Sequence, residues 1–164
     1  MRLHLICVGR LKAGPERELA THYVARAASI GRSLGVSAVD MREIDESSAR
    51  RPQDRKKEEA KAIRSLLSSR LGASAGFIAC AETGETLTSV AFADRLGRLR
   101  EQGLGDLAII IGGPDGLDPD LCAEATFTIA FGTMTWPHQL ARIMAAEQIY
   151  RALTLLAGNP YHRA

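Results

Sequence analysis

Cysteine, aromatic residues and long apolar runs are all scarce in this chain of 164 residues, and each shortage narrows its possible functions. The three cysteines, Cys7, Cys80 and Cys122, are odd in number and lie far apart in apolar surroundings. Such spacing suits neither a set of metal ligands nor a disulfide framework. We therefore expect reduced, packed thiols and no metal site.

The sequence also lacks membrane signals. No apolar stretch reaches the roughly 20 residues needed to cross a bilayer. The first residues contain no charged region followed by a long apolar run and a small-residue cleavage site. These absences predict a cytoplasmic protein with no membrane partner.

An excess of one charge is missing as well, since 21 Lys and Arg against 19 Asp and Glu leave a formal charge of +2. A nucleic-acid partner would therefore have to be met by a local basic patch. The glycine signatures of dinucleotide and nucleoside-triphosphate cradles do not occur. No repeat, low-complexity tract or linker divides the chain, so we expect one domain over residues 1–164.

Short apolar runs alternate with amphipathic segments along the chain. The patterns predict strands over 3–9, 36–44, 76–82, 106–112 and 126–131. They predict helices over 15–30, 51–71 and 89–100, a short one from Pro119, and a last one from Pro137 to about Ala157. This alternation indicates an α/β fold with a mostly parallel sheet and helices on both faces. The polar segment 46–54 is predicted to be a mobile surface loop.

The segment IIIGGPDGLDP, residues 109–119, follows the end of a predicted strand, where parallel α/β sheets bind ligands. Gly112 and Gly113 would let a ligand approach the backbone, and Pro114 with Gly116 suits a tight turn. The residues Asp118 and Pro119 resemble a helix cap and a first helical turn. A turn with no further duty explains this loop equally well.

Polar residues of the last predicted helix fall on two different sides. One group near its start comprises His138, Gln139 and Arg142, and a later group comprises Glu147, Gln148, Arg151 and Thr154. Such a helix would touch a ligand pocket at its beginning and another protein surface further along. The alternatives are a simple helical ion pair between Glu147 and Arg151, a local cap by His138, and a core position for Trp136.

The chain ends on Tyr161, His162 and Arg163. An aromatic ring, an imidazole and a guanidinium can together stack on a base, move a proton and hold a phosphate. A frayed, inert end is the alternative.

The segments IIIGGPDGL, TWPHQLARIMAAEQIYRA and NPYHR together resemble the RlmH family of ribosomal RNA large subunit pseudouridine methyltransferases, within the SPOUT class. The similarity covers nearly the whole chain. It implies an α/β sheet whose C-terminal part forms a trefoil knot, a rare exception to the rule against knots. It also implies a homodimer that uses S-adenosylmethionine, without a metal, to methylate ring nitrogen 3 of a pseudouridine in 23S ribosomal RNA of the assembled ribosome.

The resemblance also implies which residues form the site. The cofactor would lie against Cys80, Gly112, Gly113, Phe131, Gly132, Thr133, Met134, Thr135 and Trp136. The catalytic group would be His162, acting as a base or as a donor to a ring carbonyl, with Tyr161 stacking and Arg163 contacting phosphate. The substrate or the subunit interface would meet His138, Arg142, Glu147 and Arg151.

Two positions depart from the family pattern, because Ala81 replaces an acidic residue and Asp115 stands where Glu is commoner. Both are expected near the cofactor. If Ala81 disables cofactor binding, the alternative is a non-catalytic RNA-binding or ribosome-binding factor on the same fold; a second alternative is a SPOUT methyltransferase for another RNA. A basic set would meet RNA phosphates or form only a solvated face: Arg50, Arg51, Arg55, Lys56 and Lys57.

Overall fold

The computed structural model describes residues 1–71 and 75–159. Its five strands form one sheet in the order β2-β1-β4-β3-β5, and each of the four pairings between neighbouring strands is parallel. The strands are β1 (Arg2–Val8), β2 (Ala38–Ile44), β3 (Gly76–Thr86), β4 (Asp106–Ile111) and β5 (Phe127–Ala130). The predicted α/β class with a parallel sheet is confirmed.

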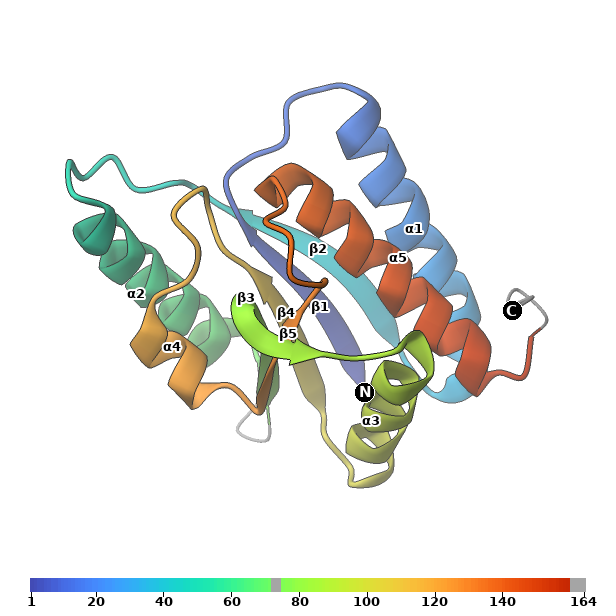
Figure 1. The fold of residues 1–164 in the computed structure, drawn as a ribbon. Coiled ribbons are helices and arrows are strands. Elements are labelled where there is room, and N and C mark those ends of the chain that lie inside the picture. Colours follow the sequence, from blue (N-terminus) through green and yellow to red (C-terminus); the bar gives the residue numbers. More distant parts are fainter. Residues whose placement is uncertain (72–74, 160–164) are drawn as a thin grey trace.

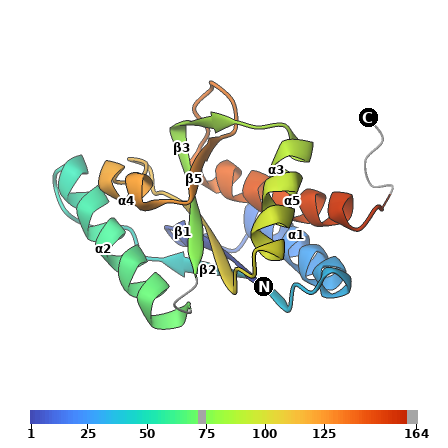
Figure 2. The same cartoon turned by 90° about the horizontal axis from the view of Figure 1, so that it is seen from below.

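Helices cover both faces of this sheet, as predicted. They are α1 (Pro15–Gly31), α2 (Pro52–Arg70), α3 (Ser89–Glu101), α4 (Pro119–Glu124) and α5 (His138–Leu156), with a 3-10 turn at Arg32–Leu34. Figures 1 and 2 show α1, α3 and α5 on one face and α2 with α4 on the other. The trefoil knot implied by the resemblance stays a prediction.

Strand β1 shows why the central strands read as continuous apolar runs. Leu3, Leu5 and Cys7 belong to the core that α1, α3 and α5 cover. Ile6 and Val8 belong to the core under α2 and α4. Because side chains alternate along a strand, a sheet buried on both faces needs apolar residues at successive positions.

One buried polar side chain joins three strands. The ring nitrogens of His4 in β1 lie 2.9 Å from Oδ1 of Asp40 in β2 and 3.1 Å from Oδ1 of Asp106 in β4. A buried imidazole needs such partners to offset its loss of water. This cluster lies where the strands begin, so it stabilises the end of the sheet opposite the predicted ligand site.

Two predicted boundaries differ from the structure. The segment predicted as a mobile loop contributes Pro52 onward to α2, and the backbone N–H of Ser47 donates to Oε1 of Glu59 at 3.0 Å. Strand β3 continues to Thr86 through an irregularity between Cys80 and Glu85 and then pairs again with β5. Within the described ranges, none of the helices has the length and apolar character that would let it cross a membrane.

Candidate functional site

A cavity of about 1070 Å³ opens at the carboxyl ends of β3, β4 and β5, where parallel α/β sheets bind ligands. Its wall brings together three separate segments: residues 80–83, residues 111–117 and residues 129–138. The two stretches that carry the predicted cofactor residues therefore meet in one place. Its volume is that of a pocket for a small molecule of cofactor size.

Most of the predicted cofactor residues lie in this wall. They are Cys80, Gly112, Gly113, Phe131, Gly132, Met134, Thr135 and Trp136. The remaining one, Thr133, lies in the same segment and is exposed. Glu82 and Lys56 also line the cavity. Sequence reasoning missed Glu82 as a site residue, and it named Lys56 only as a contact for RNA phosphates. Their positions beside Ala81 and Arg55 were the available signals.

The glycine-rich bend after β4 is a tight turn of the predicted kind. The backbone N–H of Gly116 donates to the carbonyl of Gly113 at 2.9 Å, with Pro114 and Asp115 between them. A Cβ on Gly112 would lie 2.7 Å from the carbonyl carbon of Gly116, so a side chain there would force the turn open. The space beside this glycine is filled by the backbone of the turn itself.

The next residues confirm the predicted helix cap. One carboxylate oxygen of Asp118 accepts hydrogen bonds from the backbone N–H groups of Asp120 and Leu121, at 3.1 and 3.3 Å. Pro119 follows as the first residue of α4. This cap stabilises the start of α4 and so holds the chain in place where it leaves the turn.

The side chain of Asp115 is held by α2. Nε of Arg55 lies 2.6 Å from Oδ2 of Asp115, and Nη2 lies 2.9 Å from Oδ1. The hydrogen bonds and charge of Arg55 hold the pKa of Asp115 below its usual value. The guanidinium predicted as an RNA contact is thus already engaged inside the protein.

In the segment between β5 and α5, the tryptophan side chain bonds back to the start of the segment. Nε1 of Trp136 donates to the carbonyl of Phe131 at 3.1 Å. Trp136 remains 42% exposed and Met134 is 72% exposed, so neither fills the core. Gly132 has a φ of 100°, which only glycine adopts readily. This segment forms a compact loop at the mouth of the cavity.

Arg142, predicted at the substrate or the subunit interface, is completely buried. Nη1 lies 2.6 Å from Oε1 of Glu43, and Nη2 donates to the carbonyls of Gly9 at 2.8 Å and Val8 at 3.2 Å. The interface prediction is wrong for this residue, because none of its side chain reaches the surface. It ties the first turns of α5 to the ends of β1 and β2 instead.

The partner carboxylate of Arg142 is also bound from other directions. Burial by itself would raise the pKa of Glu43, but the backbone N–H of Leu11 and the guanidiniums of Arg17 and Arg142 outweigh it and lower that pKa. Glu43 therefore stays ionised at neutral pH. Removing either partner of such a buried pair would leave the other charge uncompensated, which is costly.

The other predicted residues of α5 face two different hollows. His138 lines the main cavity, with Nε2 3.7 Å from Oε1 of Glu46. Glu147 lines a second cavity of about 520 Å³ and binds Nε of Arg151 at 2.8 Å. Thr154 of the later group is buried rather than at a surface.

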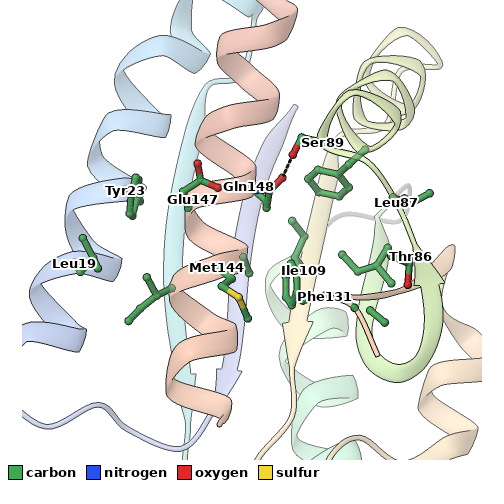
Figure 3. A pocket seen from close by; sticks show the side chains of 16 residues that line it. Leu19, Tyr23, Thr86, Leu87, Ser89, Ile109, Phe131, Met144, Glu147 and Gln148 are labelled. Atoms are coloured by element: carbon green, nitrogen blue, oxygen red, sulfur yellow. Dashed lines mark hydrogen bonds between the residues drawn. The ribbon is translucent and has the colours of Figure 1, made fainter. Parts of the chain in front are cut away.

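The second cavity, here called the helix groove, lies among α1, α3, α5 and the end of β3 (Figure 3). Leu19 and Tyr23 come from α1, and Met144 comes from α5. Oγ of Ser89 donates to Oε1 of Gln148 at 2.8 Å across it. Residues 129–132 line both cavities and separate them.

The three thiols are free, as predicted. Burial raises the pKa of the Cys7 thiol to about 12 and also raises the pKa of Cys80. Both are protonated at neutral pH and are poor nucleophiles. Across residues 1–71 and 75–159, no cluster of three or more His, Cys, Asp or Glu is arranged to hold a metal ion. Tyr161, His162 and Arg163 lie outside the described residues.

Known proteins resemble this chain over its whole length. A family described as predicted SPOUT methyltransferase matches residues 1–162. Ribosomal RNA large subunit methyltransferase H of Beijerinckia indica is 53% identical over 164 residues, covering 100% of both chains. The protein of the same name from Xanthobacter autotrophicus is 54% identical, again with 100% coverage of both.

A solved structure supports the fold. The probable methyltransferase from Bordetella pertussis is 12% identical and covers 92% of this chain and 95% of its own, with a TM-score of 0.53. Family match, full-length relatives and fold all agree. The chain therefore belongs to the SPOUT methyltransferase family, among the enzymes related to ribosomal RNA large subunit methyltransferase H.

Proposed function

We propose that this enzyme transfers the methyl group of S-adenosylmethionine to nitrogen 3 of a pseudouridine in 23S ribosomal RNA. The observation that carries this proposal is the single cavity in which residues 111–117 meet residues 129–138. The name shared by its full-length relatives supports large-subunit ribosomal RNA as the substrate. The enzyme would act in the cytoplasm on the assembled ribosome.

The cavity suits S-adenosylmethionine in size and in lining. Its wall combines the apolar side chains of Ile129, Phe131 and Trp136 with the carboxylate of Glu82. An adenine ring and a thioether chain need apolar surface, and a positively charged sulfonium or ammonium is stabilised by a carboxylate. Because Glu82 lines the cavity next to Ala81, the departure at position 81 leaves an acidic group at the site.

The bound cofactor would supply an electrophilic methyl group. The chain must hold the acceptor nitrogen in line with it and remove the proton that this nitrogen carries at neutral pH. His162 is the proposed group for that proton, because imidazole changes charge near neutral pH. Tyr161 would stack on the base and Arg163 would bind a phosphate. No step requires a metal.

A second copy of the chain would complete the site by bringing its C-terminal residues to the cavity. Large apolar side chains are exposed at the two cavities: Leu19 at the helix groove, and Met134 and Trp136 at the main cavity. Exposed apolar surface of this kind is typical of protein interfaces. Glu147 and Arg151, beside the helix groove, are the proposed polar residues of that interface.

Phosphates of the RNA would be met by the exposed cations near the start of α2. Arg50, Arg51 and Lys57 are exposed there, and Lys56 lines the cavity. Arg55 is left out of this set because Asp115 already engages it. Counterion release from such contacts would make substrate binding weaken steeply with salt.

Methyl transfer can be measured with tritiated S-adenosylmethionine on free 23S RNA, isolated large subunits and joined ribosomes from cells lacking the enzyme. We expect incorporation into joined ribosomes, and none when the target pseudouridine is replaced by uridine. Absence of incorporation from all three, or label in transfer RNA instead, would contradict the proposed function.

Replacing Gly132 by alanine should weaken S-adenosylmethionine binding. A Cβ there meets no atom within 4 Å, but the φ of 100° strains an alanine, so the loop at the cavity mouth must change shape. Gly103 is a matched control, with a φ of 82°, no neighbour for a Cβ within 4 Å, and a position on the turn before β4. We expect both variants to lose about 1–2 kcal/mol of stability, and Gly132→Ala alone to lose affinity in calorimetry.

A further inference from the structure

Arg55 uses all three of its guanidinium nitrogens inside the protein. Two of them hold the carboxylate of Asp115, at 2.6 and 2.9 Å, in a bidentate pair. The third, Nη1, donates to the carbonyls of Ala49 and Arg50, each at 3.0 Å. Such a planar fork fixes both the distance and the orientation of the carboxylate it binds.

The carboxylate belongs to the turn that forms one wall of the main cavity. Asp115 is the third residue of the turn that the Gly116 N–H and the Gly113 carbonyl close. The side chains of Arg55 and Asp115 are 27% and 24% exposed, so the pair is partly shielded from water. Shielding strengthens a charge-assisted pair relative to one on the open surface.

A second side chain of α2 supports the same turn. Glu59, one helical turn after Arg55, is only 6% exposed. A Cβ on Gly113 would lie 3.4 Å from its Oε2, so the turn and Glu59 are in close packing. The turn is thus packed against α2 on one side and open to the cavity on the other.

From this geometry we propose that Arg55 is a positioning residue, which keeps the 113–116 turn in the shape that binds S-adenosylmethionine. The proposal rests on the proposed function for its ligand. Arg55 holds the binding wall without contacting the reacting atoms.

The same helix supplies a matched control. Arg64 makes a bidentate pair with Glu124 of α4, at 2.7 to 3.1 Å, and both ion pairs join residues 60 apart in the chain. Replacing either arginine by methionine removes one charge and one bidentate pair from α2. Only the Arg55 pair includes a residue of the cavity wall, namely Asp115.

The variants Arg55→Met, Arg55→Lys and Arg64→Met test the proposal. Calorimetry would give the dissociation constant for S-adenosylmethionine, and hydrogen exchange the protection of the Gly116 amide without cofactor. We expect Arg55→Met to raise the dissociation constant about tenfold and to speed exchange at Gly116, as loss of a charge-assisted pair implies. Arg55→Lys keeps the charge but loses the fork, so it should resemble Arg55→Met, while Arg64→Met should resemble the unaltered protein.

Equal affinity and equal exchange in Arg55→Met and Arg64→Met would overturn the proposal, and so would normal behaviour of Arg55→Lys. If the unaltered protein bound no S-adenosylmethionine, the proposed function would fail. Exchange at Gly116 would still decide whether Arg55 holds the turn.

Discussion

Replacing His162 by alanine is expected to lower the rate of methyl transfer by about 10²–10⁴-fold, the usual contribution of a positioned acid or base. Affinity for S-adenosylmethionine should change little, because the proposed cofactor wall is formed by residues 80–83, 111–117 and 129–138. Single-turnover kinetics on ribosomes and calorimetry with the cofactor measure the two quantities separately. Full activity in the variant would reject His162 as the proton acceptor.

A mixed dimer tests whether this histidine acts across subunits. His162→Ala would be combined with a second inactive chain carrying Gly112→Trp, which fills the turn where even a Cβ would lie 2.7 Å from backbone. If the histidine of one chain serves the cavity of the other, the mixed dimer regains one complete site. Each variant by itself should stay inactive. No recovery on mixing would contradict a shared site, provided that the two chains pair.

Replacing Arg142 by leucine should destabilise the protein by about 3–5 kcal/mol, the typical cost of breaking a buried ion pair from one side. Glu43 would lose a 2.6 Å contact, and the carbonyls of Val8 and Gly9 would lose their donor. Urea unfolding at a fixed protein concentration measures the loss, since the stability of the proposed dimer would depend on concentration.

The control for Arg142 is an exposed pair nearby. Arg10 and Asp45 form an ion pair whose side chains are 68% and 73% exposed. Arg10→Leu should cost less than about 1 kcal/mol, as surface pairs do. Similar losses in the two variants would show that burial of Arg142 does not govern its contribution.

Much of this architecture could be predicted from local pattern. Apolar runs bounded by polar segments located the strands, and Pro114 with Gly116 indicated the tight turn that the structure contains. These features depend on residues a few positions apart, so the sequence order already contains them. The position of the main cavity also followed, because clefts of parallel α/β sheets lie at the carboxyl ends of the strands.

Contacts between distant residues could not be predicted in this way. Helical spacing places Arg142 on the same side as His138. It does not show whether that side faces solvent or the carboxylate of Glu43, which is 99 residues away in the chain. The same holds for Arg55, whose partner is 60 residues distant. Glu43 was an available signal, as one of the charged residues inside a predicted strand of a sheet covered on both faces.

Residues 129–132 form a wall with the main cavity on one side and the helix groove on the other. A displacement of this wall that enlarges one compartment must shrink the other. Loading of the methyl donor and docking of a second subunit over the groove would therefore not be independent events. By thermodynamic reciprocity, if the methyl donor changes the affinity for the second subunit by some factor, the second subunit changes the affinity for the methyl donor by the same factor.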